Sequence, residues 1–292
     1  MNRGTGMSGD SVIPFGFESL PVRGALIHLS RSWRRMLRYH DYDALITETL
    51  GHAAAATGLI AQSLKFDGTI TLQIQGRGVL RMLVMQCTSE LDLRGMASAE
   101  PVTTVSTFGD LIERGHCAVT VDNGKRPYQG IVDINAESLA ACLEHYFARS
   151  VQVPSHIALV ADEDVAGGVL LQQVPGHSID SDDWNRLNFL TKTLGCSDFG
   201  RDAGIQLIGK LFAEDDVRVY KPRGVNFRCR CSRLKTEDVL KMLGKQEARE
   251  TLASEGLIEI ICEYCGRKRT FDEVDVERLF IDNVIQGPDS VQ

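Results

Sequence analysis

The sequence predicts an α+β protein with three parts: an N-terminal mixed sheet-and-helix domain, a helical linker and a small C-terminal four-cysteine zinc module. Three observations predict this organisation. Residues 14–179 alternate between strand-like and helix-like hydrophobic periodicity. Residues 180–226 carry mainly helical patterns, and four of the eight cysteines gather as two close pairs in the last quarter of the chain.

The composition is that of a folded protein with a sizeable core. Of the 292 residues, 43% are hydrophobic and 24% are charged. The net charge of −7 argues against a nucleic acid or an anionic membrane as the main partner. Residues 227–292 contain 11 Lys and Arg against 13 Asp and Glu, so the cysteine module also lacks the basic character of nucleic-acid-binding zinc modules.

The N-terminal domain is expected to follow a disordered stretch, residues 1–13. A helix is predicted over Ala44–Leu64, after the capping residues Asp41 and Asp43. The alternating run Thr69–Gln75 predicts a strand, which forms a hairpin with the apolar run Val79–Met85. The remaining expected elements of this domain are strands near 116–122, 128–134, 156–162 and 168–174, and a helix over Glu137–Arg149.

The region 180–226 is predicted to be a metastable, lightly packed helical linker. Ser181, Asp182 and Asp183 cap a helix that continues to about Leu194, and a second helix is expected over 201–213. The sequence Lys221-Pro222-Arg223-Gly224 marks its end. The predicted module, residues 227–285, then contains helices near 236–244, 246–254 and 273–283 and a strand at Leu257–Ile261, before a tail at 286–292.

The two cysteine pairs predict a zinc site. Cys229-Arg-Cys231 and Cys262-Glu-Tyr-Cys265 are separated by residues 232–261, and close thiol pairs joined by a loop are typical of tetrahedral zinc ligation. Arginine and lysine residues flank both pairs, and we expect them to lower the thiol pKa values. A polar start without an apolar stretch, and the short apolar run Ala53–Ala61, predict a cytoplasmic protein whose thiols are reduced.

The same site has two further interpretations besides a structural zinc. A module of about 60 residues has a small core, so its folding depends strongly on the metal. Each pair can close on itself under oxidation, and disulfides over such short loops would not replace the metal as a staple. Oxidation would then unfold the module, which makes the site a redox switch. A thiol oxidoreductase centred on Cys262 and Cys265 is the third interpretation.

The other signals predict no enzyme. Four more cysteines, Cys87, Cys117, Cys142 and Cys196, lie outside the module; the first three are expected to be small buried hydrophobes, and Cys196 falls in the linker. Neither a phosphate-binding loop nor a nucleophile elbow is present in the sequence. The arginines around Trp33 (Arg34, Arg35 and Arg38) are interpreted as a solvated helix face.

The chain resembles the heat-shock protein 33 family of redox-regulated chaperones. The C-terminal resemblance rests on Cys229-x-Cys231 and Cys262-x-x-Cys265-Gly266. Over about residues 15–285 the other matching motifs, in the family's order, are HDYD (40–43), LKFDG (64–68), LQIQGRG (72–78), RGMA (94–97), YQGIV (128–132), LAACLEHYFARS (139–150) and AGGVLLQ (166–172).

The resemblance implies a specific activity. It implies that the reduced protein holds one zinc ion through Cys229, Cys231, Cys262 and Cys265 and is inactive. Oxidation then forms the disulfides Cys229–Cys231 and Cys262–Cys265, releases zinc and unfolds the module and linker. The oxidised protein, expected to dimerise, binds unfolding or oxidatively damaged client proteins without ATP, as a holdase. A constitutive zinc-stabilised interaction module without redox switching is the alternative; nucleic acid and membrane are not expected partners.

Overall fold

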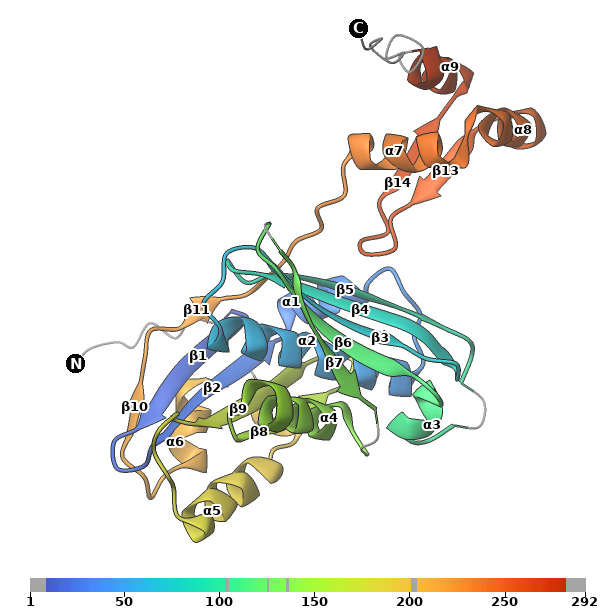
Figure 1. Ribbon diagram of the computed structural model, residues 1–292. Coiled ribbons are helices and arrows are strands. Elements are labelled where there is room, and N and C mark those ends of the chain that lie inside the picture. Colours follow the sequence, from blue (N-terminus) through green and yellow to red (C-terminus); the bar gives the residue numbers. More distant parts are fainter. Residues whose placement is uncertain (1–8, 103–104, 125, 135–136, 201–203, 282–292) are drawn as a thin grey trace, which may run out of the picture. The chain divides into compact units, whose positions relative to one another are not determined.

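The computed structural model describes residues 9–102, 105–124, 126–134, 137–200 and 204–281. The chain divides into two compact units, Met1–Arg228 and Cys229–Gln292 (Figure 1). The predicted α+β class is confirmed. Residue 227, the expected first residue of the module, belongs to a strand of the first unit.

Unit 1 is built on two six-stranded sheets, which we name sheet A and sheet B. Sheet A has the order β10 (Val217–Val219), β1 (Ser11–Phe17), β2 (Val22–Leu29), β9 (Ala166–Gln173), β8 (Ser155–Ala161), with β11 (Arg223–Gly224) also paired to β1. Sheet B has the order β12 (Asn226–Phe227), β5 (Asp92–Ala99), β4 (Leu80–Thr88), β3 (Thr69–Gln75), β6 (His116–Asp122), β7 (Tyr128–Asp133). The predicted β3–β4 hairpin is confirmed, with Thr69 opposite Thr88.

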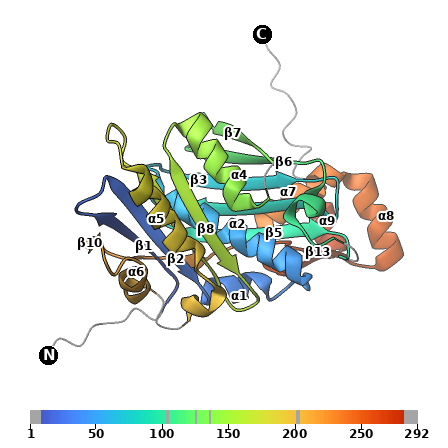
Figure 2. The ribbon, with the colours of Figure 1, turned by 90° about the horizontal axis from the view of Figure 1, so that it is seen from below.

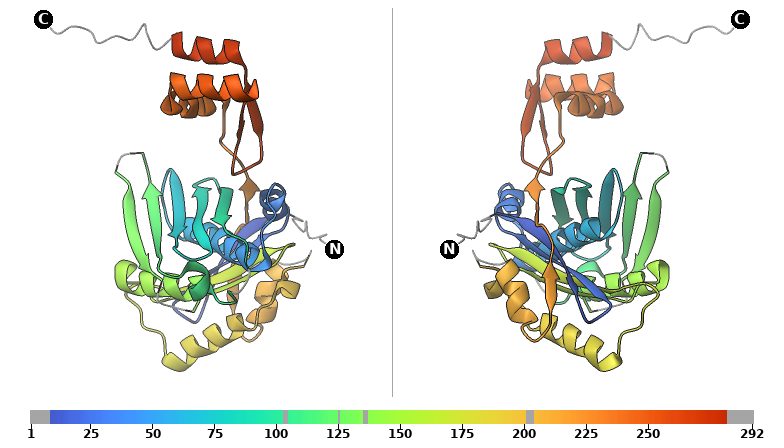
Figure 3. Two further views of the ribbon diagram at one scale, coloured as in Figure 1. Left: turned by 90° about the vertical axis from the view of Figure 1, so that its right-hand side faces the viewer. Right: turned by 90° about the vertical axis from the view of Figure 1, so that its left-hand side faces the viewer.

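Helix α2 (Ala44–Ser63) lies between the two sheets and forms the centre of the main core (Figure 3). Its run Ala53–Ala56 is fully buried, and such small side chains allow both sheets to approach the helix closely. At Gly58, a Cβ atom would come within 2.3 Å of Ile27 Cδ1 on sheet A. The predicted helix is therefore confirmed, ending one residue earlier than expected.

Helix α2 is also the one helix within the described residues that is long and apolar enough to cross a membrane. Its 18-residue apolar window is 78% buried inside the structure, as expected for the core helix of a folded domain. The run Ala53–Ala61 is part of this helix, so the apolar stretch is longer than the short run that the sequence analysis weighed as a membrane span.

The face of sheet A opposite α2 is covered by α5 (Ser181–Lys192), η2 (Cys196–Phe199) and α6 (Ile205–Leu211), as Figure 2 shows. Their buried side chains form, with the strands, a second core that we name the linker core. It consists of Ile13, Phe15, Phe17, Val22, Leu26, Val165, Val169, Leu171, Leu187, Phe199, Leu207, Ile208 and Phe212. Five apolar side chains of this region, those of Leu187, Phe199, Leu207, Ile208 and Phe212, are buried against the sheet, so the region is packed more tightly than the sequence analysis expected.

Two smaller differences from the sequence analysis concern local structure. Strand β1 begins at Ser11 because Val12 and Ile13 are buried on opposite faces of sheet A, so residues 11–13 are not disordered. The predicted helix Glu137–Arg149 is α4 (Leu139–Tyr146) followed by a π turn, η1 (Phe147–Val151). The other short helices of unit 1 are α1 (Arg31–Leu37) and α3 (Phe108–Ile112). Residues 1–8 and 282–292, which include the predicted tail, lie outside the described residues.

The described residues of unit 2 form a hairpin and three helices. Strands β13 (Ile258–Ile261) and β14 (Lys268–Phe271) pair antiparallel, with Ile258 opposite Phe271. The helices are α7 (Arg233–Leu243), α8 (Lys245–Glu255) and α9 (Glu273–Ile281). The buried apolar cluster of this unit is Leu240, Ala248, Ile258, Phe271, Val276 and Leu279. This small core supplies little hydrophobic stabilisation.

Candidate metal centre

The structure brings together the four cysteines of the two predicted pairs. The Sγ atoms of Cys229, Cys231, Cys262 and Cys265 all lie within 4.8 Å of one another. The Cys229–Cys262 and Cys231–Cys265 sulfur separations are 3.7 Å and 3.6 Å. Sulfurs about 2.3 Å from a zinc ion in a tetrahedron lie about 3.8 Å apart, so these separations fit the edges of a tetrathiolate site. Among the described residues, no other group of three or more His, Cys, Asp or Glu side chains lies close enough together to hold a metal ion.

The second pair is positioned by the turn of the β13–β14 hairpin. The backbone N–H groups of Cys265 and Gly266 donate to the Cys262 carbonyl at 3.2 and 2.8 Å, and Cys262 N donates to Arg267 O at 3.0 Å. Gly266 has a φ of 61°, in the left-handed region that glycine adopts without a steric penalty. The turn thereby directs the Cys262 and Cys265 thiols toward the same point.

The first pair is positioned by the start of helix α7. Ser232 caps this helix by accepting a hydrogen bond from Lys235 N at 3.2 Å. Arg233 fixes the helix to the rest of unit 2 through an ion pair with Asp275 at 2.8 Å and by lying 4.7 Å from the centre of the Phe271 ring. Cys231 thus directly precedes an anchored helix end.

Burial and hydrogen bonding give the thiols different acidities. Burial acts to raise the pKa of Cys229, but hydrogen bonds from the Cys231 backbone N–H and from the other thiols outweigh it and lower the pKa to about 7. Burial raises the pKa of Cys265 to about 12, and burial also raises the pKa of Cys262. Negative charge therefore collects first on Cys229, and a bound cation would favour loss of the remaining protons.

The flanking cations contribute less than the sequence analysis expected. Arg228 pairs with Asp92 at 3.2 Å, and Lys268 pairs with Glu259, so both charges are partly neutralised. The thiol pKa shifts come from burial and hydrogen bonds. The backbone N–H groups of Cys231, Tyr264 and Arg267 donate to thiols in this site. The sequence analysis missed these donors because nearly every residue has a backbone N–H group, so residue type does not mark them. The one sequence signal was Gly266, which indicates a turn at the second cysteine pair.

The other cysteines are not part of the site. Cys87, Cys117 and Cys142 are fully buried, which confirms their interpretation as small core residues. Burial raises the pKa of Cys87 and of Cys117 to about 12, so neither is a ready nucleophile. Cys196 is partly exposed, and burial together with Asp162 raises its pKa to about 11.

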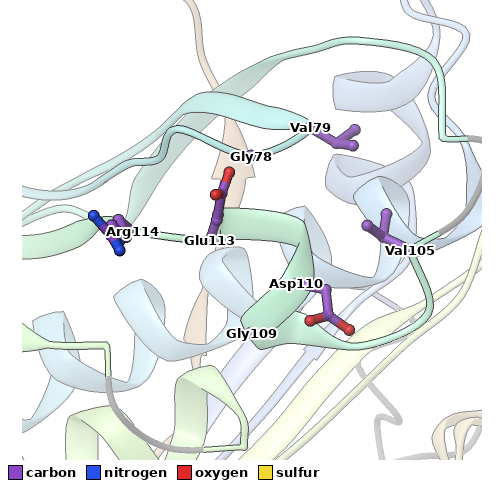
Figure 4. Close-up of a pocket in the computed structure, with 7 residues that line it drawn as sticks. All are labelled: Gly78, Val79, Val105, Gly109, Asp110, Glu113 and Arg114. Carbon is purple, nitrogen blue, oxygen red and sulfur yellow. The ribbon is translucent and has the colours of Figure 1, made fainter.

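A surface hollow beside α3 offers no comparable chemistry. It is lined by Gly78, Val79, Val105, Gly109, Asp110, Glu113 and Arg114 (Figure 4). Asp110 accepts a hydrogen bond from the Thr107 hydroxyl at 2.7 Å, within the cap of α3. Its carboxylates are exposed, and none of the eight cysteines lines it. The four-thiol cluster is therefore the candidate functional site.

The fold and the site together define a two-unit α+β protein whose C-terminal unit carries a four-thiol centre able to hold a metal ion. The chain belongs to the Hsp33 family, since the family model described as Hsp33 protein matches residues 10–272.

Relatives of similar length support the assignment. A 33 kDa chaperonin of Methylobacillus flagellatus is 36% identical over 288 residues, covering 97% of this chain and 98% of the relative. A 33 kDa chaperonin of Nitrosococcus oceani is 39% identical over 276 residues, covering 94% and 96%. The crystal structure of the 33 kDa chaperonin (heat shock protein 33 homolog) from Thermotoga maritima matches with a TM-score of 0.79 and 25% identity, covering 94% of this chain and 99% of that one.

Proposed function

We propose that this protein is a cytoplasmic, redox-regulated molecular chaperone that holds unfolding proteins without ATP and without catalysing a reaction. The observation that carries the proposal is the cluster of four thiols in tetrahedral reach of one another, in a chain of the Hsp33 family. The 33 kDa chaperonin name of its relatives supports the chaperone activity.

In the reduced state, one zinc ion is held by Cys229, Cys231, Cys262 and Cys265, and the protein is inactive. Thiolate ligands suit zinc, and the metal supplies the charge that stabilises four deprotonated sulfurs. Structural zinc contributes on the order of 10–16 kcal/mol to the folding of small modules. Since the core cluster of unit 2 contains six buried apolar side chains among its described residues, we infer that its fold depends on the metal.

Oxidation reverses this state. Two molecules of peroxide oxidise the four zinc-bound thiolates to two disulfides, Cys229–Cys231 and Cys262–Cys265; with four protons from the solvent, the peroxide is reduced to four molecules of water, and Zn²⁺ is released. The thiolate is the reacting species, and the low pKa of Cys229 makes it the first candidate once the metal loosens. Each disulfide lies within one cysteine pair, so neither one connects the two pairs across residues 232–261. Unit 2 therefore loses the cross-link that the metal provided.

The linker is the second element of the switch. The described part of this region up to Gly224 is held on sheet A by the linker core and by pairing of β10 and β11 with the edge of β1. Its release would uncover apolar side chains of β1, β2 and β9 together with an open strand edge. Both features bind unfolding polypeptides without reading their sequence, and they also favour dimerisation of the oxidised protein.

The test starts from the reduced, zinc-loaded protein, treated with peroxide at mild heat. Released zinc is followed with a chromophoric chelator, and light scattering of a heat-denaturing client is followed in the same samples. We expect about one zinc ion per chain to appear together with suppression of scattering, and dithiothreitol to reverse both.

Retained zinc with unchanged scattering would identify the site as a constitutive structural zinc in an interaction module. Peptide mapping of the oxidised protein tests the pairing separately. Bonds between Cys229 and Cys262 or between Cys231 and Cys265, the pairs at 3.7 and 3.6 Å, would contradict the proposed disulfides.

A further inference from the structure

Helix α1 presents four arginines on a single face. Arg31, Arg34, Arg35 and Arg38 follow the spacing i, i+3, i+4, i+7, which places them side by side along a helix. All four are exposed, whereas Ser32, Trp33 and Met36 on the other side are buried. The rise of about 1.5 Å per residue spreads the four charges over roughly 10 Å. We name these four residues the arginine face.

The helix that carries the arginine face is held rigidly. The carboxylate of Asp10 accepts the backbone N–H groups of Ser30 and Arg31 at 2.8 and 3.0 Å, and that of Ser32 as well. Trp33 Nε1 donates to Asp162 O at 2.7 Å. Arginines on an anchored helix lose little further backbone entropy when they bind a partner.

The charges of the arginine face are largely unneutralised. Arg34 pairs with Asp164 at 3.5 Å, where the two side chains are 59% and 73% exposed, which makes a weak surface pair. Within the described residues, no carboxylate lies within ion-pair distance of Arg31, Arg35 or Arg38. Arg35 and Arg38 instead lie over the rings of Phe227 and Tyr39, at 5.6 and 5.8 Å.

This arrangement does not serve the stability of the helix. Like charges at spacings of three and four residues repel. The helix dipole favours cations at the C-terminal end, where Arg34 and Arg35 lie in the last turn and Arg38 is the C-cap, but it disfavours Arg31 in the first turn. In a chain of net charge −7, such a concentration of positive charge calls for an anionic partner.

We propose that the arginine face binds clusters of carboxylates on client polypeptides; this inference rests on the proposed chaperone function. The planar guanidinium group pairs carboxylates through two parallel hydrogen bonds. The chain's net negative charge repels acidic clients at long range, so one local cationic face would orient them at the surface. A few carboxylates within about 10 Å match the extent of this face.

The observations favour an acidic peptide over a phosphate polymer. Stacking of nucleic-acid bases needs free aromatic faces, and the rings of Phe227 and Tyr39 each already carry a guanidinium. A long polyanion would also extend beyond the four arginines onto a molecule that is acidic overall. A short carboxylate cluster meets neither obstacle.

The test measures the anisotropy of a fluorescein-labelled twelve-residue peptide of Glu and Ser on the full-length protein, reduced and oxidised. In the variant Arg31→Gln, Arg35→Gln, Arg38→Gln, we expect affinity to fall at least about tenfold. The control variant Arg77→Gln, Arg114→Gln, Arg126→Gln removes the same charge from exposed positions elsewhere and should change affinity less than about twofold. Binding by the parent protein should weaken as salt is raised.

Equal losses in the two variants would overturn the proposal, because the attraction would then be unspecific. Tight binding of inorganic polyphosphate or single-stranded RNA to the arginine face, without peptide binding, would overturn it in favour of a phosphate polymer. Suppression of aggregation of a client of low charge should be equal in both variants. If the parent protein itself did not suppress the aggregation of this client, the result would instead argue against the chaperone function.

Discussion

Each cysteine in this chain takes its reactivity from its surroundings. Buried thiols such as Cys87 and Cys117 have a pKa of about 12 and are inert, whereas Cys229 has a pKa of about 7 because hydrogen bonds outweigh its burial. The same residue type therefore serves as a core side chain in unit 1 and, in the proposed switch, as a metal ligand and oxidisable group in unit 2. Position in the fold, and not the thiol itself, separates the two roles.

Replacement of one proposed ligand should remove the metal. In Cys231→Ser, we expect zinc affinity to fall by at least about a hundredfold, more than the loss caused by changes outside the first ligand shell. Zinc content after dialysis against a chelator of known affinity measures this. The control Cys196→Ser, which alters a thiol outside the cluster, should keep its zinc; a zinc-loaded Cys231→Ser protein would contradict the ligand assignment.

The pH dependence of unit 1 should reflect His52 on α2. Burial lowers the pKa of His52 to about 4, despite Glu48 at 3.9 Å. The unfolded histidine has a pKa near 6.5, so the unfolded chain binds the proton first as pH falls. Stability is therefore complete above about pH 6.5 and falls between about pH 6.5 and 4, by an amount on the order of 1–3 kcal/mol.

The variant His52→Gln should lose this part of the acid destabilisation. Urea unfolding followed by tryptophan fluorescence measures it, because Trp33 and Trp184 both lie in unit 1. The exposed His145→Gln variant on α4 should keep the parent slope between about pH 6.5 and 4. An unchanged slope in His52→Gln would show that the histidine is solvated in the folded protein.

At the scale of elements, the contact of η2 with β9 decides how the linker is held. The Phe199 ring packs directly on Gly167, where a Cβ atom would lie only 2.4 Å from it. The absence of a side chain on this strand residue therefore permits the docking. Because the packing is this tight, a methyl group added at Gly167 should displace the Phe199 ring. We expect the proposed switch to act through loss of the same contact.

Gly167→Ala should loosen the linker without any oxidation. The displaced Phe199 should cost about 1–3 kcal/mol, so residues 180–226 should be cleaved faster by a protease, and the reduced protein should suppress aggregation partially. Gly209→Ala on α6 is a matched control, because nothing lies within 4 Å of the added atom. Parent-like proteolysis and activity in Gly167→Ala would contradict the proposed role of linker docking.

At the scale of the whole molecule, the two units differ in how they are stabilised. Unit 1 has a large core centred on α2 and the linker core on sheet A, whereas the described residues of unit 2 form a core cluster of six buried apolar side chains and a thiol cluster. If unit 2 holds zinc as proposed, removal of the metal should therefore act selectively on this unit, and a reaction at four sulfurs should unfold the whole unit.

Hydrogen–deuterium exchange should make this selectivity visible. After zinc removal by a chelator under reducing conditions, peptides from α8 and β13 should lose protection, whereas peptides from α2 should keep it. Restoring zinc should restore the protection of unit 2. Unchanged protection of α8 without metal would show that the six-residue core suffices for folding.

The sequence by itself determined the α+β class, the α2 helix, the β3–β4 hairpin and the four cysteines of the cluster. These features depend on local periodicity, turn residues and spacing, which are visible along the chain. Only the tertiary structure decided the burial of Phe199 on Gly167, the different acidities of Cys229 and Cys265, and the absence of an ion-pair partner for the Arg31 side chain among the described residues. These depend on neighbours far apart in the sequence, because burial and hydrogen bonding arise only when the elements pack together.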